Sequence, residues 1–194
     1  MNLYYAPGAC SLAPHIALNA AGLPYELMSI DRAKRTEDGR DFLTVNARGY
    51  VPALELDDGT VLTENIAILS YIAHRSGGVF AQEGMMPWRT LEAISFMSTA
   101  IHGNLVPFWK NLPDEEKERG RLALVKHIAS IADQLGDRSF LLGEKMTIAD
   151  PYLFWVLRSV PVSGIDLPER LQTYLARMSE LPSVTKALVE EGLA

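Results

Sequence analysis

Residues 3–18 read LYYAPGACSLAPHIAL and place a strand, a turn and a helix in direct succession. Leu3–Tyr5 has the composition of a strand core, and Pro7-Gly8 is a turn signal. Ser11 is a residue type that favours the N-cap position of a helix. The helix is predicted to end near Gly22, because glycine readily adopts the left-handed conformation found after helix ends. Cys10, the only cysteine, falls at the strand-to-helix junction.

The rest of the first 77 residues predicts a small mixed sheet with helices. The apolar alternation and turn residues indicate strands at 26–30, 51–56 and 60–63, with a tight turn at Asp57-Asp58-Gly59 between the last two. Residues 31–40 are polar and predict a loop, and 41–46 could hold a short helix. A helical spacing of apolar residues follows Asn65. This order predicts a thioredoxin-like α/β domain over 1–77, followed by a linker at 78–87.

Residues 88–194 carry only helical patterns and predict an all-α bundle. Ile94, Met97, Ile101 and Leu105 form one apolar stripe, and Pro107 should kink or end that helix. A long helix is expected from Pro113 to Gly136, and its apolar face is predicted to consist of Leu122, Val125, Ile128 or Ala129, Ala132 and Leu135. Thr147–Asp150 resembles a capping box. The helix that it opens is apolar on nearly all sides, which predicts a central position, and two shorter helices follow at 167–178 and 184–189.

Charge and composition exclude several classes of function. Lys and Arg number 18 against 24 Asp and Glu, and the net charge is −6 with no basic stripe. We therefore expect neither nucleic acid nor membrane as a partner. There is no apolar run long enough to span a bilayer and no leader pattern, so a cytoplasmic protein with a reduced thiol is expected. One cysteine and scattered histidines give no metal-ligand spacing.

Cys10 has two interpretations. A lone cysteine is more often a small apolar core residue than a reactive one. Here, however, it precedes a helix N-terminus, where free N–H groups and the helix dipole favour a thiolate. A second thiol, as in CxxC redox sites, is absent from Cys10-Ser11-Leu12-Ala13. Any disulfide chemistry would therefore require an external thiol.

Three further segments could complete a binding site. If the Val51-Pro52 bond is cis, the backbone of Val51 could pair with a peptide-like ligand as an added strand does. Glu64-Asn65 opens a helix, and it either caps that helix or binds the charged head group of an amino acid. Lys34, Arg35 and Arg40 are either solvated or a cation for a second carboxylate. His102 flanks the apolar stripe and is as consistent with a structural role as with a functional one; the other histidines are expected to be structural.

The chain resembles a cytosolic glutathione transferase, most closely the bacterial beta class. The matching segments are residues 3–18, NARGYVPALELDDGTVLTENIAIL (46–69), IHGNLVPFW (101–109) and GEKMTIADPYLFWVLR (143–158). The resemblance extends over almost the whole chain. It implies a thioredoxin-like domain that binds glutathione, an all-helical domain with a second-substrate pocket, and a homodimer.

The resemblance also implies roles for individual residues. Cys10, Ser11 and His102 would surround the glutathione sulfur. The glutathione-binding residues would be Tyr5, Arg35, Tyr50, Val51, Pro52, Glu64 and Asn65, and the second pocket would be lined by Val106, Phe108 and Trp109. Arg35 stands where the family usually has Lys, and Asn65 where it commonly has Ser.

The expected function is detoxifying transfer of the glutathione thiolate to small, mostly apolar electrophiles, with glutathione as co-substrate and no metal. A lowered thiol pKa would raise the thiolate fraction at neutral pH. One alternative is a glutathione-dependent thiol-disulfide or peroxide reductase with Cys10 as the covalent centre. Another is a non-catalytic carrier of apolar ligands.

Overall fold

A computed structural model describes all residues, 1–194, as two compact units. The first unit contains residues 1–81 together with 181–194, and the second contains 82–180. The division after residue 81 lies within the predicted linker. The assignment of 181–194 to the first unit differs from the sequence prediction, which put every residue after 87 in the helical domain.

The first unit contains a four-stranded sheet in the order β2-β1-β3-β4. Its strands are β1 (Asn2–Tyr5), β2 (Glu26–Ser29), β3 (Ala53–Glu55) and β4 (Val61–Thr63). β1 pairs parallel with β2 and antiparallel with β3, and β3 pairs antiparallel with β4. In register, Leu3 lies opposite Leu27 on one side and Leu54 on the other. The predicted mixed, thioredoxin-like sheet is confirmed.

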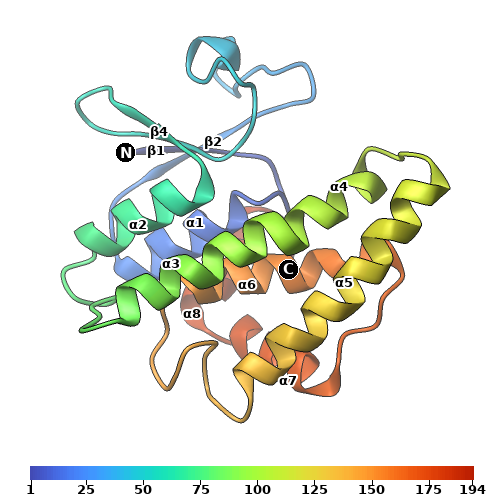
Figure 1. Ribbon diagram of the computed structural model, residues 1–194. Helices are drawn as coiled ribbons and strands as arrows, with labels where there is room; N and C mark the ends of the chain where they lie inside the picture. The colour runs from blue at the N-terminus through green and yellow to red at the C-terminus, as the bar shows by residue number, and fades with distance from the viewer. The chain divides into compact units, whose positions relative to one another are not determined.

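Helices α1 (Leu12–Ala21) and α2 (Asn65–Arg75) lie along one face of this sheet (Figure 1). A short 3-10 helix spans Phe42–Thr44, and α8 (Pro182–Glu190) packs against α1. The strand and helix side chains between them, including Leu3, Ile16 and Leu54, are completely buried. As predicted, α1 ends at Gly22, whose φ of 63° is left-handed and whose N–H closes the last turn.

The second unit consists of helices only. Its elements are α3 (Met86–Phe96), a π-helical stretch (Met97–His102), α4 (Gly103–Trp109), α5 (Asp114–Leu135), α6 (Ala149–Ser159), a 3-10 helix (Val160–Ser163) and α7 (Glu169–Ser179). The predicted stripe of Ile94, Met97, Ile101 and Leu105 is fully buried. Pro107 lies inside α4, which ends two residues later. Helix α6 is buried along nearly its whole length, as its apolar composition predicted.

The predicted apolar face of α5 is partly wrong. Leu122 and Val125 are 67% and 53% exposed, whereas Leu124, Ile128 and Ile131 are buried. Two overlapping stripes at helical spacing compete in this sequence, and the packing of α5 against neighbouring helices selects the one through Leu124. A helical period alone does not choose between such stripes when both are apolar.

The capping box at the start of α6 is confirmed and anchors the second unit. The Asp150 carboxylate accepts hydrogen bonds from the Thr147 N–H at 2.7 Å and the Leu141 N–H at 2.8 Å. It also accepts from the Tyr174 hydroxyl of α7 at 2.9 Å and from the Thr147 hydroxyl at 3.1 Å. Burial raises the pKa of Asp150, and these four donors act in the opposite direction.

Candidate functional site

The turn between β1 and α1 presents Cys10 at the start of the helix. The Ser11 hydroxyl is buried and bonds the backbone of Ala6, accepting from its N–H at 3.3 Å and facing its carbonyl oxygen at 3.4 Å. It makes no cap bond to α1, which corrects the predicted capping role. These contacts close the turn and leave the Ser11 hydroxyl engaged with Ala6 rather than open to a ligand.

Cys10 keeps partial exposure, and its sulfur contacts the loop that precedes β3. The Cys10 thiol donates to the Val51 carbonyl oxygen over 3.3 Å. The Asn65 side chain acts to lower the pKa of the same thiol. Burial raises the pKa of Cys10 to about 11, and this outweighs the opposing effects of Asn65 and of the backbone N–H groups of Cys10 and Ser11. The helix N-terminus favours the thiolate, as the sequence suggests, but desolvation has the larger effect on the pKa and favours the protonated thiol at neutral pH.

Val51-Pro52 forms a cis peptide bond directly before β3. The preceding loop is held by two side chains that donate to its carbonyls. Asn46 Nδ2 reaches the Tyr50 oxygen at 2.8 Å, and Lys34 Nζ reaches the Gly49 oxygen at 2.7 Å. Tyr50 itself is 67% exposed. The loop therefore fixes the backbone of Val51 next to Cys10 while the Tyr50 ring remains available at the surface.

Glu64 and Asn65 bring the N-terminus of α2 to the same place. Glu64 has an unusual positive φ of 72°, makes no side-chain cap bond, and pairs with Arg48 at 3.5 Å in an exposed position. Asn65 is only 8% exposed. Its Oδ1 atom is buried and has no hydrogen-bond partner. Simple capping therefore does not explain the pair, because neither side chain caps α2.

Among the three predicted cations, only Arg35 keeps its charged group free of an intramolecular bond. Lys34 is engaged by Gly49 and lies over the Tyr50 ring. Arg40 pairs with Asp38 at 2.8 Å and donates to the Tyr4 hydroxyl at 2.9 Å. Arg35 is exposed, and its backbone N–H is held by Asp31. Tyr5 is 9% exposed, with its ring near His15, so it contributes mainly to the wall beneath the turn.

The sequence analysis missed residues at the other end of the chain that hold the turn in place. Glu191, just after α8, accepts from the Gly8 N–H at 2.9 Å and pairs with His15 Nδ1 at 2.9 Å. His15 is completely buried, and its Nε2 faces Glu190 at 2.8 Å. The structural role expected for His15 is consistent with these bonds. No local pattern linked it to Glu190-Glu191, because the partners lie about 175 positions apart.

His102 ends the π-helical stretch of the second unit and lies in an aromatic cluster. Its ring centroid is 4.6 Å from that of Trp155 and 5.4 Å from that of Trp109. His102 Nδ1 lies 2.9 Å from the Tyr152 hydroxyl. Burial lowers the pKa of His102, which favours the neutral ring. With Nδ1 accepting from Tyr152, Nε2 would carry the proton and could donate to an anion.

The three predicted pocket residues on α4 do not share one environment. Trp109 is 43% exposed and contacts His102 edge-to-face. Val106 is half-buried and lies one helical turn from His102 on the same face. Phe108 instead packs toward α5, where Arg121 lies over its ring at 5.6 Å. The structure thus groups Val106 and Trp109 with His102 and places Phe108 on a different side of α4.

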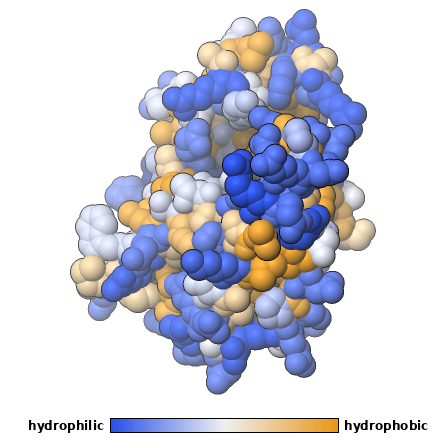
Figure 2. All heavy atoms as spheres, turned by 45° about the vertical axis from the view of Figure 1, so that its right-hand side comes forward, coloured by the Kyte–Doolittle hydropathy of each residue, from blue (hydrophilic) through white to orange (hydrophobic).

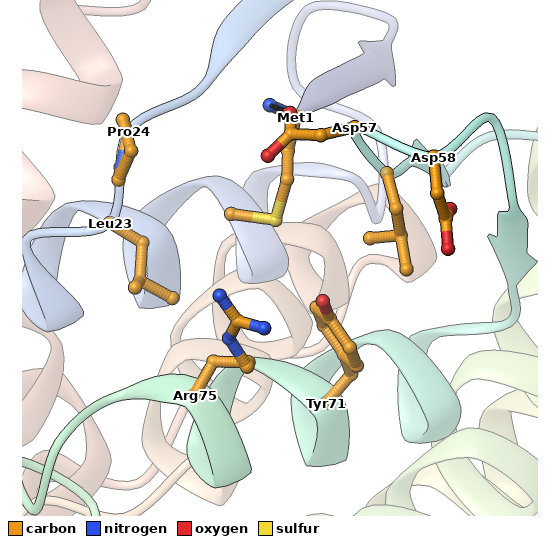
Figure 3. Close-up of a pocket in the computed structure, with 8 residues that line it drawn as sticks. Met1, Leu23, Pro24, Asp57, Asp58, Tyr71 and Arg75 are labelled. Atoms are coloured by element: carbon orange, nitrogen blue, oxygen red, sulfur yellow. Dashed lines mark hydrogen bonds and ion pairs between the residues drawn. The ribbon is translucent and has the colours of Figure 1, made fainter.

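A separate hollow of about 220 Å³ lies at the opposite end of β1 from Cys10. Figure 3 shows Tyr71 and Arg75 of α2 pointing toward Met1, with Asp57 and Asp58 on the neighbouring turn. The amino group of Met1 pairs with Asp57 at 2.8 Å. None of the predicted site residues lines this hollow. No group of three or more His, Cys, Asp or Glu side chains is arranged to hold a metal ion.

Comparison with known proteins finds matches over both parts of the chain. A family model described as Glutathione S-transferase, N-terminal domain, matches residues 1–74, and one for the C-terminal domain matches 114–177. The chain is 39% identical to Glutathione S-transferase GstA of Escherichia coli O157:H7, with all of both chains covered.

Two solved structures are similar over the full length of both chains. One is a sphingomonad glutathione S-transferase complexed with glutathione, with a TM-score of 0.93 and 40% identity. The other is a bacterial beta class glutathione S-transferase of Sphingomonas chungbukensis, with a TM-score of 0.93 and 38% identity. Family models over both parts of the chain, full-length relatives and the shared fold lead to one conclusion: the chain belongs to the glutathione S-transferase family.

Proposed function

We propose that this protein is a glutathione transferase that joins the glutathione thiolate to small, mostly apolar electrophiles. The observation that carries the proposal is the hydrogen bond from the Cys10 thiol to the Val51 carbonyl in the first unit, together with Asn65 at the start of α2, which acts to lower the pKa of that thiol. It combines a thiol, an accessible strand-like backbone and a helix N-terminus. These are the groups needed to receive the sulfur, the peptide backbone and a charged end of a small peptide.

In this proposal each part of glutathione meets a different segment. The cysteinyl backbone pairs with Val51 beside Pro52, while Glu64 and Asn65 receive the γ-glutamyl end. Arg35, with its guanidinium free, receives the glycyl carboxylate, and the exposed Tyr50 borders the site. Charge-assisted bonds to such groups position the ligand as well as bind it.

The reaction is a nucleophilic attack by glutathione sulfur. Glutathione loses its thiol proton to solvent, and the thiolate forms a new S–C bond as the leaving group departs with its electron pair. A protonated Cys10 can donate a hydrogen bond to that thiolate, which lowers the energy of the charged form. The neutral His102 ring, with Val106 and Trp109, is proposed to border the second-substrate pocket. The Ser11 hydroxyl, already engaged with Ala6, supports the turn in this scheme.

The raised pKa of Cys10 also separates the main proposal from its rival. A reductase that uses Cys10 as the covalent centre needs a thiolate at neutral pH. Burial instead raises the pKa of Cys10 to about 11, which favours a hydrogen-bonding neighbour over a nucleophile. We therefore place conjugation first.

Two substitutions of Cys10 test this. Cys10→Ser keeps an O–H donor and Cys10→Ala does not, while neither can form a disulfide. We expect conjugation to an activated aryl chloride to persist in both variants and to be faster in Cys10→Ser. If both variants lost all turnover, with the aryl chloride and with a small disulfide alike, the covalent reductase would replace the proposal. Failure of the wild-type protein to bind glutathione by calorimetry, with tight binding of apolar dyes, would instead support the carrier.

We further propose that the protein is a cytoplasmic homodimer. No helix is long and apolar enough to cross a membrane. Exposed apolar side chains on α3 and α5, among them Trp88 and Leu122, are suited to contact a second copy. Figure 2 shows that the surface on one face of the molecule carries exposed hydrophobic side chains among hydrophilic ones. Sedimentation velocity should give about twice the 21.4 kDa chain mass; a single species at chain mass would contradict the dimer.

A further inference from the structure

The second unit carries a hollow of about 510 Å³ that the proposed function does not use. It lies where the C-terminal end of α5 meets α7 (Figure 1). Ligand pockets commonly enclose about 300–1,000 Å³, so the hollow has room for a small molecule. Three arginines line it, Arg138, Arg170 and Arg177, against two acids, Asp137 and Glu169. In a chain with a net charge of −6, the hollow is therefore a local excess of positive charge.

Two of these arginines are held by backbone carbonyls rather than by carboxylates. Arg138 donates to two carbonyl oxygens in the last turn of α5, one of them that of Leu135 at 3.1 Å. Arg177 donates to the Ser139 carbonyl oxygen and lies over the buried Tyr174 ring at 5.7 Å. The end of a helix carries about half of a negative charge, which offsets only part of the charge of Arg138. Both guanidinium groups are thus held in place while their charge stays largely uncompensated.

The third arginine has a partner that a ligand could displace. Arg170 pairs with Asp137 at 3.2 Å, and the Asp137 side chain is 98% exposed. Exposed ion pairs contribute little free energy, so a stronger anion can take the place of Asp137. Arg170, Thr173 and Arg177 follow one another along α7 at spacings of three and four, which places them on one face of the helix. Thr173 adds a hydroxyl donor between the two arginines.

We propose that this hollow binds a small anion of the phosphate class through Arg138, Arg170, Arg177 and the Thr173 hydroxyl. The donors come from the end of α5 and from two separate turns of α7. A phosphate group has three strong acceptor oxygens and suits donors from several directions. A carboxylate is planar, and a single arginine fork can satisfy it. Three arginines against two acids leave one net positive charge in the lining, which favours a multiply charged anion.

Isothermal titration calorimetry with inorganic pyrophosphate at low salt tests the site in the full chain. The wild-type protein should bind one pyrophosphate per chain. Arg138→Gln and Arg177→Gln should each weaken the affinity about tenfold or more, as expected for the loss of a charge-assisted hydrogen bond. The matched control is Arg119→Gln, which makes the same change in net charge at an 80% exposed position of α5 outside the hollow. It should bind as the wild type does; an equal loss of affinity would mean general charge attraction only and would overturn the site.

Replacing Asp137 by asparagine should have the opposite effect. The change removes the carboxylate that competes for Arg170, so pyrophosphate should bind about two- to fivefold more tightly. Asp114→Asn makes the same change in charge at the fully exposed start of α5 and should leave the affinity unchanged. Unaltered binding in Asp137→Asn, or equal tightening in both variants, would remove Arg170 from the site.

A variant that keeps every arginine guards against loss of folding. Arg138 and Arg177 also tie backbone carbonyls, whereas Thr173→Val leaves those bonds in place. It should weaken pyrophosphate binding about fivefold or more with an unchanged circular dichroism spectrum. Retained wild-type affinity in this variant would exclude the hydroxyl from the site.

Stability and competition complete the test. Pyrophosphate should raise the urea midpoint measured by tryptophan fluorescence, because all tryptophans lie in the second unit and a ligand that binds only the folded state stabilises it. No heat of binding and an unmoved midpoint at millimolar pyrophosphate would overturn the proposal. Excess S-methylglutathione should leave pyrophosphate bound. Displacement would place the anion in the glutathione site of the first unit instead, which would also overturn it.

Discussion

Replacing Asp150 by alanine should destabilise the second unit strongly. The buried carboxylate is the common acceptor for the N–H groups of Leu141 and Thr147 and for the Tyr174 hydroxyl. It therefore joins the segment before α6, the first turn of α6, and α7. It also accepts from the Thr147 hydroxyl, so its removal leaves four buried donors without this acceptor.

The size of the effect follows from those donors. An orphaned buried donor costs about 1–3 kcal/mol. Burial raises the pKa of Asp150, so loss of the carboxylate also relieves a desolvation penalty, and the low end of the range applies. Four donors at about 1 kcal/mol each give a loss of about 4 kcal/mol in the free energy of unfolding. Domains are typically stable by about 5–15 kcal/mol, so the loss is a large fraction.

Urea unfolding followed by tryptophan fluorescence measures this directly. Trp88, Trp109 and Trp155, the three tryptophans, all lie in the second unit and report its unfolding. Asp150→Asn retains one acceptor oxygen and should fall between wild type and Asp150→Ala. The control is Asp58→Ala, which removes one exposed bond to the Thr60 N–H in the β3–β4 turn and should leave the tryptophan transition unchanged. A loss below about 1 kcal/mol in Asp150→Ala would refute this account of the four-donor site.

Three further predictions concern other parts of the chain. Leu124→Ala should cost about 2–5 kcal/mol and Leu122→Ala less than about 0.5 kcal/mol, because only Leu124 is buried; equal urea midpoints would contradict the assigned face of α5. Tyr4→Phe should move acid unfolding to higher pH, because the hydrogen bond from the Tyr4 hydroxyl is the main cause of the lowered pKa of Glu55. A carboxyl whose pKa is lower in the folded protein than in the unfolded chain stabilises the fold at pH values above its unfolded pKa. That stability is lost as the pH falls through its folded pKa. Circular dichroism from pH 6 to 2 follows it, and an unmoved transition would count against it. His102→Ala should slow conjugation about tenfold or more, by a factor that is constant from pH 7 to 9 because burial keeps His102 neutral there; a pH-dependent factor would indicate a titrating role.

Features of local structure could be predicted from the sequence where residues within one short segment determine them. The turn and helix after β1, the left-handed Gly22, the apolar α6 and the Thr147–Asp150 capping box depend on neighbouring residues. Turn chemistry, capping and a helix that is apolar on all sides leave few alternatives within a short window. Cys10 and Val51, which meet at the candidate glutathione site in the first unit, could likewise be named from the order of elements and the family resemblance.

Other features depended on segments far apart in the chain. The face of α5 was undecidable between two apolar stripes until its packing buried Leu124. The last helix, α8, belongs with the first unit because Glu190 and Glu191 meet His15 and the Gly8 N–H, contacts that no local pattern encodes.

Cys10 shows the same division most clearly. Its position at a helix N-terminus is local, and the sequence alone predicted that such a position favours a thiolate. Its protonation state is not local, because desolvation depends on every segment packed around the sulfur. The sequence alone determined the fold class, the strand–turn–helix unit and the identity of the thiol. Only the tertiary structure decided that the thiol donates to the Val51 carbonyl and that burial raises its pKa, since desolvation by distant segments sets the free energy of its charged form.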